Sequence, residues 1–198
     1  RLLGHEIDII SGVEEARLIY VGVSRTLPAI SGEQLFVDIG GGSTELAAGK
    51  AFTPHTLESL YMGCVSMSRS YFADGSITAA AVAKARKAAR LELRPVEQRF
   101  RGMAWERVAG ASGTIRATAN ILEALGGEQQ RITAEGLERL LALMTRQGHV
   151  KNLVLPGLTE ERAPVFPGGV AILAETMHAL GIQQMTVAPG ALRDGILY

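Results

Sequence analysis

The order of apolar and polar positions in the first third of the chain predicts one helix followed by three strands. The segment 11–20 is expected to be the start of the helix, where a Ser-Gly pair can cap it and two glutamates occupy its first turn, which favours negative charge. Apolar runs separated by glycine-rich turns predict strands over 35–39, 44–48 and 53–60. We expect these three leading strands to be antiparallel neighbours in one sheet.

The rest of the chain alternates between helical and strand patterns. Two short strands are predicted, at 107–111 and 185–188. Helices are predicted over 62–72, 78–100, 112–125, 133–147, 169–180 and 191–198. In the longest of them, Pro95 is expected to kink or weaken the helix. This order predicts an α/β fold, a mixed sheet with flanking helices.

The turn between the first two strands carries the clearest candidate chemistry. The first strand ends at Asp38, three glycines and a serine follow over 40–43, and Glu45 comes early in the next strand. Glycines let the backbone turn sharply, and a concave row of N–H groups attracts phosphate. Two flanking carboxylates supply oxygen ligands that suit Mg²⁺. The spacing indicates a phosphate-and-metal turn; the alternative is a plain β-hairpin with exposed acids.

Other well-known motifs do not fit the sequence. No Gly-Lys-Ser/Thr closes the turn as in a Walker A loop, and the strand expected after it excludes the dinucleotide-binding fingerprint. The four histidines have no partner at the spacing of a zinc site, and no Gly-x-Ser-x-Gly elbow of a serine hydrolase is present. The glycine turn is therefore the main candidate.

Three further segments are weaker candidates. The segment 110–114 (Gly-Ala-Ser-Gly-Thr) follows a strand and opens a helix, so it can face an anion or simply cap the helix. Glu14 and Glu15 complement the helix dipole, and one of them becomes a general base only if the fold brings it to the glycine turn. Arg162 can bind a phosphate bidentately or pair with a neighbouring glutamate.

Composition limits the classes of partner. With 20 Lys and Arg against 20 Asp and Glu, the net charge is zero, which argues against general nucleic-acid or membrane-surface binding. Five basic residues of the helix 78–100 are expected to form a solvated face, with a polyanion track as the alternative: Lys84, Arg86, Lys87, Arg90 and Arg94. The lone Cys64 is expected to be a buried apolar residue and fits a reducing, cytoplasmic compartment. No apolar stretch is long enough to span a membrane.

Taken in order, these segments resemble the Ppx/GppA family of exopolyphosphatases and guanosine pentaphosphate phosphohydrolases. The resemblance covers nearly the whole chain, at 10–19, 38–46, 62–65, 110–114, 158–162 and 190–195. It implies the actin-like (ribonuclease H-like) ATPase fold, two lobes with the active site between them. By this resemblance 1–198 is a single lobe, the second, with 1–22 as the helix or linker between lobes. Because the chain opens with Arg1 and not Met, we expect it to be a fragment of a longer protein, and the resemblance implies that this protein also has an N-terminal lobe.

The resemblance also implies a role for each candidate residue. Glu15 matches the glutamate that activates the attacking water. Asp38 and Glu45 match acids that position Mg²⁺ and this water. Arg162 matches an arginine that contacts the polyanionic or nucleotide substrate. The residues that match the phosphate-cradling loop are Gly40, Gly41, Gly42 and Ser43.

The activity implied is release of terminal phosphate from inorganic polyphosphate by Mg²⁺-assisted attack of water. Guanosine pentaphosphate is the rival substrate within the family. Two other classes stay open: an actin-like kinase or ATPase with an adenosine pocket around 110–114, and a non-catalytic module that binds the nucleotide alarmone. Neither nucleic acid nor membrane is expected as a partner, a homodimer is compatible with the sequence, and this lobe alone is expected to hydrolyse little.

Overall fold

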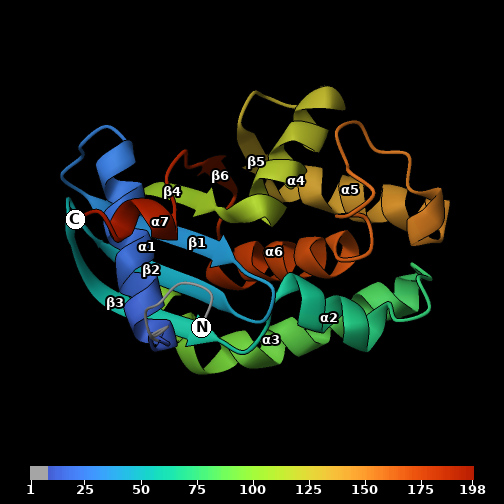
Figure 1. Ribbon diagram of the computed structural model, residues 1–198, viewed down its shortest axis with the longest axis horizontal. Coiled ribbons are helices and arrows are strands. Elements are labelled where there is room, and N and C mark those ends of the chain that lie inside the picture. The colour runs from blue at the N-terminus through green and yellow to red at the C-terminus, as the bar shows by residue number, and fades with distance from the viewer. Residues whose placement is uncertain (1–8) are drawn as a thin grey trace, which may run out of the picture.

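A six-stranded mixed sheet is the central element of the fold (Figure 1). The computed structural model describes residues 9–198, so the beginning of the predicted linker 1–22 lies outside the described part. The strands follow one another across the sheet in the order β3-β2-β1-β4-β6-β5. Their bounds are β1 (Glu33–Ile39), β2 (Thr44–Lys50), β3 (Thr53–Leu60), β4 (Trp105–Ala111), β5 (Arg131–Thr133) and β6 (Gln184–Val187).

The predicted antiparallel unit and the mixed sheet are both confirmed. β1 pairs antiparallel with β2, and β2 pairs antiparallel with β3, while β1, β4 and β6 run parallel to one another. At the far edge, β5 pairs antiparallel with β6. The carboxyl ends of β1 and β4 therefore lie side by side, at the edge where open α/β sheets bind their ligands.

Helices cover both faces of the sheet (Figure 1). One face carries α1 (Gly12–Thr26) and α7 (Leu192–Gly195). The other face carries α2 (Cys64–Tyr71), α3 (Ala79–Arg101), α4 (Ser112–Ala124), α5 (Ala134–Gln147) and α6 (Phe166–Leu180). A short 3₁₀ helix, η1 (Val150–Asn152), follows α5. The most deeply placed helix is α6, where every residue except His178 is buried.

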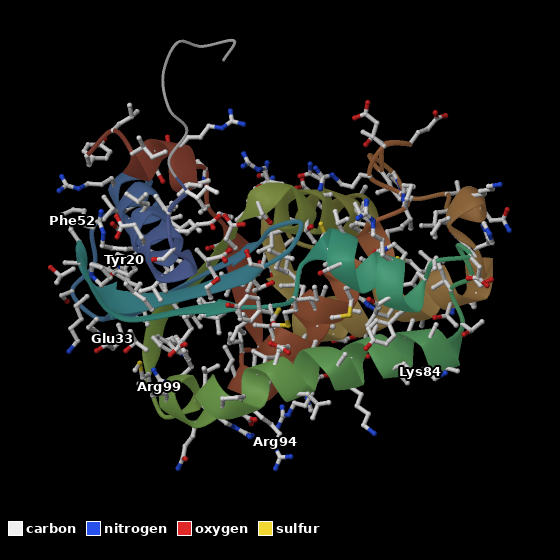
Figure 2. All side chains as sticks on the ribbon, turned by 60° about the horizontal axis from the view of Figure 1, so that its bottom comes forward. Tyr20, Glu33, Phe52, Lys84, Arg94 and Arg99 are labelled. Atoms are coloured by element: carbon white, nitrogen blue, oxygen red, sulfur yellow. The ribbon has the colours of Figure 1, made fainter. Side chains whose placement is uncertain are left out.

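Strand alternation decides which side chains face α1. In β1, Leu35 and Val37 join the larger core beneath α2–α6, whereas Phe36 joins the smaller core beneath α1. Tyr20 of α1 packs on Phe36 with ring centroids 5.0 Å apart, and Figure 2 shows Tyr20 between its helix and the sheet. Even-numbered positions of β1 therefore face α1, and these include Asp38.

Side-chain hydroxyls cap the starts of α1 and α3, and the cap of α1 was expected from the sequence. The Ser11 hydroxyl accepts a hydrogen bond from the Glu14 amide at 3.2 Å and caps α1, and Thr78 caps α3 by accepting from the Ala81 amide at 3.1 Å. Pro95 lies inside α3, which continues past it to its C-terminal end, so the predicted weakening does not interrupt the helix. No helix in the described part of the chain is long and apolar enough to cross a membrane.

The structure also departs from the prediction at one strand, which was missed, and at the bounds of two helices. The strand β5 was not predicted, because Ile132 is its only apolar residue. The helix α6 begins at Phe166 and not at 169: Pro167 is tolerated because the first amides of a helix lack intrahelical partners. The last helix covers only Leu192–Gly195 of the predicted 191–198.

Candidate active site

Asp38 and Glu45 face each other across the β1–β2 hairpin. They are register partners, and Asp38 is also aligned with Ala111 at the end of the parallel strand β4. Asp38 shares its face of the sheet with Phe36, and Glu45 shares its face with Ala47; both apolar residues lie in the core beneath α1. The two carboxylates therefore point to the α1 side, where β1 ends.

Glu15, in the first turn of α1, is the third carboxylate of the group. Its negative charge raises the pKa of both Asp38 and Glu45, so the three groups lie within electrostatic reach of one another. Glu14 is instead engaged by Arg17, whose guanidinium lies 2.7 Å from its carboxylate. Of the two candidate glutamates, the fold brings Glu15 to the hairpin acids.

Burial sets the protonation behaviour of the hairpin acids. Burial first, and then the charge of Glu15, raise the pKa of the half-buried Asp38 to about 6. Glu45 is 1% exposed, and burial raises its pKa to about 7 against the opposing effect of hydrogen bonds from neighbouring serines. One of these is Ser59, whose hydroxyl donates to Glu45 Oε1 at 2.9 Å. The hairpin is present, but its acids are not exposed as the plain-hairpin alternative required.

The glycine turn is oriented by the start of α2. The carbonyls of Gly40 and Gly41 accept hydrogen bonds from the amides of Cys64 (2.9 Å) and Val65 (3.0 Å). In a planar trans peptide the N–H points opposite to the C=O, so the amides of Gly41 and Gly42 are turned away from α2. Both glycines are exposed, and no acceptor in residues 9–198 takes their N–H groups. These two amides are free to bind an anion.

Gly40 differs from the other two glycines of the turn. Its amide donates to the carbonyl of Ser43 at 2.9 Å and closes the turn, so it is not available to a phosphate. The predicted phosphate cradle of residues 40–43 therefore has fewer available amides, because the free N–H groups begin at Gly41. A Cβ on Gly63 would clash with the backbone of Gly41, so a glycine at the start of α2 allows this close approach.

The second predicted turn lies at the neighbouring strand end. β4 ends at Ala111 and α4 begins at Ser112, whose φ of 87° is unusual for a residue with a side chain. The guanidinium of Arg162 lies against Gly113, in the first turn of α4. The first amides of a helix lack intrahelical partners and favour anions. The structure thus brings Arg162 to this turn, one strand away from Asp38.

The alternative for Arg162, an ion pair with an adjacent acid, is not observed. Among the described residues, neither Glu160 nor Glu161 forms an ion pair with Arg162. The guanidinium of Arg162 is therefore available to bind another anion.

The five basic residues of α3 that were expected to form a solvated face do not all lie on one such face. Arg86 pairs with acids of α5 and α6 at 2.8 and 3.0 Å, and Arg90 pairs with an acid of its own helix at 2.9 Å. Figure 2 shows Lys84 and Arg94 along the outside of α3. The prediction of a solvated face holds for the exposed members, which are Lys84, Lys87 and Arg94.

Two residues that act on the site were missed by sequence reasoning. Ser59 is the register partner of Glu45 in β3, so a correct register for the second hairpin would have found it. Arg116 lowers the pKa of Asp38 through its charge, although burial outweighs it. Arg116 lies one turn beyond Ser112 on α4, and only the parallel pairing of β1 with β4 shows that this helix begins near Asp38.

The carboxylates of Asp38 and Glu45 suit a metal site in which the substrate phosphate and water supply the remaining ligands. The described residues contain no group of three or more His, Cys, Asp or Glu side chains placed to hold a metal ion. Mg²⁺ is commonly held by one or two carboxylates, with phosphate oxygens and waters as its other ligands. Asp38 and Glu45 fit this arrangement, because they are adjacent, largely withdrawn from water and form no ion pair within residues 9–198.

A cavity of about 430 Å³ lies along α2 and does not coincide with the carboxylates. Its walls carry both charge signs, with Arg69 and Asp74 among them, and none of the three carboxylates lines it. The candidate active site is therefore defined by the strand ends and not by this cavity.

Curated relatives match the chain along its whole length. It is 43% identical over 198 residues to the guanosine-5′-triphosphate,3′-diphosphate pyrophosphatase of Aeromonas hydrophila, a match that covers all of this chain and 40% of that protein. The protein of the same name from Aliivibrio fischeri is 42% identical, with 39% of its length covered. The chain thus spans about 40% of the length of these relatives.

Solved structures share the fold. The PPX-GPPA enzyme of Aquifex aeolicus superposes with a TM-score of 0.81 at 24% identity, over all of this chain and 66% of that one. An exopolyphosphatase from Cytophaga hutchinsonii gives a TM-score of 0.83 at 21% identity, over 98% of this chain and 64% of that one. The predicted fold class, that of the actin-like ATPases, is confirmed. The model of the Ppx/GppA phosphatase family matches residues 1–198, and the chain belongs to this family.

Proposed function

We propose that this chain carries the site that hydrolyses the terminal 5′-phosphate of guanosine pentaphosphate. One observation carries the proposal: free amides of Gly41 and Gly42 adjoin the carboxylates of Glu15, Asp38 and Glu45 at one edge of the sheet. Phosphoryl transfer depends mainly on alignment and charge neutralisation. At this edge the amides can align the phosphate, and the carboxylates can orient a water molecule and hold a cation that neutralises charge.

Glu15 is the proposed general base. It accepts a proton from a water molecule as the water oxygen attacks the terminal phosphorus. The bond from that phosphorus to the bridging oxygen breaks, so the products are inorganic phosphate and a substrate one phosphate shorter. A positioned general base commonly contributes ~10²–10⁴-fold to the rate.

The backbone and Arg162 hold the phosphates. The Gly41 and Gly42 amides are fixed in direction by α2, so they can stabilise phosphate oxygens without reorganising. The guanidinium of Arg162, at the start of α4, offers a fork of donors to an adjacent phosphate.

Asp38 and Glu45 are the residues that would hold Mg²⁺. When bound there, the ion would neutralise charge on the phosphate oxygens. The carboxylates fit this role because two neighbouring acids withdrawn from water are stabilised in their charged form by a cation.

The sequence analysis ranked polyphosphate before guanosine pentaphosphate, and the proposal reverses this order. Relatives that are 42–43% identical are named for guanosine 5′-triphosphate,3′-diphosphate, whereas the exopolyphosphatase structure is only 21% identical. The nucleotide therefore ranks first for this chain. Inorganic polyphosphate is the second candidate, since the proposed site addresses only a terminal phosphate.

An N-terminal lobe is proposed to complete the cleft. The residues described here supply one wall, and this lobe alone is expected to hydrolyse little. A homodimer remains compatible with this arrangement. Tight ATP binding by the full-length protein would favour a kinase or ATPase instead, and binding of guanosine pentaphosphate without phosphate release would favour a regulatory module.

A phosphate-release assay on the full-length protein tests the proposal. Guanosine pentaphosphate and long-chain polyphosphate are compared at equal terminal-phosphate concentration, with Mg²⁺ and with excess chelator. We expect Mg²⁺-dependent release with a higher kcat/KM for the nucleotide. Release from neither substrate would refute the hydrolase, and faster release from polyphosphate would restore the second candidate.

A further inference from the structure

Arg162 and Gly113 meet although they lie far apart in the sequence. A Cβ built on Gly113 would lie 2.7 Å from both Cζ and Nη1 of Arg162 and closer still to Nη2. The guanidinium thus occupies the space that any side chain at position 113 would fill. This contact joins the turn before α6 to the first turn of α4.

The backbone around Arg162 is anchored by hydrogen bonds, but its guanidinium is not. The Arg162 and Ala163 amides donate to the Thr159 carbonyl at 3.1 and 3.0 Å, and the Val165 amide donates to the Arg162 carbonyl at 3.0 Å. No hydrogen bond or ion pair within residues 9–198 holds the guanidinium itself. Its position therefore depends on the shape of the surface beneath it, which is the bare backbone at Gly113.

A second glycine contact keeps the two helix starts together. A Cβ on Gly169 of α6 would lie 2.5 Å from Cγ2 of Thr114, so the two helices approach closely behind Gly113. The turn that carries Arg162 leads directly into α6. The backbone on both sides of the Arg162–Gly113 contact is thus fixed by packing.

We infer that Gly113 is a positioning residue that acts through Arg162. Because Gly113 has no side chain, the guanidinium can lie on the first turn of α4, where its charge and the free helix amides address the same phosphate. The inference rests on the proposed function and deepens it, since it names what places the substrate-binding arginine. A side chain at this position would push the guanidinium away from those amides.

The substitution Gly113→Ala separates positioning from folding. Gly113 is not among the glycines with positive φ, so alanine fits its backbone. The nearest atoms to the new Cβ belong to the end of a flexible side chain and not to backbone, so Arg162 can move aside. Alanine also has the higher helix propensity. We therefore expect the variant to fold with an unchanged or slightly higher Tm.

The test is a double-mutant cycle in the full-length protein with Gly113→Ala, Arg162→Ala and the double variant. Steady-state kinetics use guanosine pentaphosphate, and the rise of Tm on adding tripolyphosphate measures anion binding directly. Loss of one charge-assisted contact predicts a KM increase of about tenfold or more in each single variant, with kcat changed less than about threefold. If Gly113 acts through Arg162, the double variant is no worse than Arg162→Ala alone.

Gly102→Ala is the matched control. Its Cβ would meet only the Gln98 carbonyl oxygen, at 3.6 Å, at the end of α3, so KM and the anion-induced Tm rise should stay at the wild-type level. Unchanged KM in Gly113→Ala, additive effects in the double variant, or a large fall of Tm without anion would each overturn the inference. If the wild type releases no phosphate but Gly113→Ala still loses the tripolyphosphate-induced Tm rise, the hydrolase proposal fails and the positioning role stands.

Discussion

Glu14 and Glu15 are adjacent acids in different surroundings, which makes them a matched pair for mutation. Glu15→Gln should reduce phosphate release by ~10²-fold or more, because the amide cannot take the proton from water. Substrate binding should be nearly unchanged, since the proposed phosphate contacts lie on other residues. Glu14→Gln removes only the pair with Arg17 and should keep wild-type turnover. Near-normal kcat in Glu15→Gln would rule out its role as the base.

The raised pKa values of Asp38 and Glu45 predict how stability depends on pH. With folded pKa values of about 6 and about 7, above those of the unfolded chain, their stabilising contribution is complete in acid and is lost as pH rises through these values. Glu45→Gln removes one such group, so the Tm of the variant minus that of the wild type should grow between about pH 5 and about pH 8. Added Mg²⁺ should raise the wild-type Tm more at the upper end of this range. If the Tm of Glu45→Gln minus that of the wild type shrinks as pH rises, the charge of Glu45 does not destabilise the folded protein.

At the scale of residues, the sequence identified the candidate carboxylates better than the side chains that surround them. Asp38 and Glu45 were found because two acids border a glycine run, a pattern with a direct physical meaning. Glu15 could be chosen over Glu14 only by family resemblance, because helix periodicity does not say which residue meets a distant hairpin. Ser59 and Arg116 were missed because their influence comes from strand pairing across the sheet.

At the scale of elements, the contact between α2 and the glycine turn can be tested with two glycines. Gly63→Ala would place a methyl group against the backbone of Gly41 and should lower the free energy of unfolding by about 1–3 kcal/mol, the usual range for overpacking. Because the turn must shift, phosphate release should fall as well.

Gly42→Ala is the control, since a Cβ there meets nothing within 4 Å. Its free energy of unfolding, measured by urea denaturation, should match that of the wild type. Equal stability of the two variants would contradict the close packing of α2 on the turn.

Elements with local signals were predicted well, and those that depend on the rest of the sheet were not. The long α3 has a threonine cap and a regular alanine-rich pattern, and it continues through Pro95 to Arg101. The strand β5 has only three residues and is defined by its pairing with β6. The helix α6 was predicted to begin at 169, but Gly168 also belongs to it, and both Gly168 and Gly169 are needed where α6 approaches α2 and α4 closely.

At the scale of the whole molecule, an ionic cluster around the buried Glu175 joins three helices behind the sheet. Glu175 of α6 is 6% exposed and accepts a hydrogen bond from Arg86 of α3 at 3.0 Å, while Arg86 also pairs with Glu138 of α5 at 2.8 Å. Glu175→Ala would leave the guanidiniums of Arg86 and Arg90 without this buried partner. We expect a loss of about 2–3 kcal/mol of unfolding free energy, since hydrogen bonds to charged groups are worth more than neutral ones.

Glu138→Ala is the control for this cluster, because its side chain is 56% exposed. It should cost less than about 1 kcal/mol in urea denaturation, as for most surface ion pairs. Both variants should keep the wild-type kcat per folded molecule, since the cluster lies away from the carboxylates. A large loss of kcat in folded Glu175→Ala would mean that the cluster also shapes the active site.

The central claim is that one hairpin turn seats a phosphate beside a divalent cation. A crystal structure of the full-length Glu15→Gln variant with guanosine pentaphosphate and Mn²⁺ tests it most directly. The account predicts an anomalous-scattering peak at the carboxylates of Asp38 and Glu45 and a terminal phosphate within hydrogen-bond distance of the Gly41 and Gly42 amides. A metal bound elsewhere, or a phosphate that touches neither amide, would contradict it.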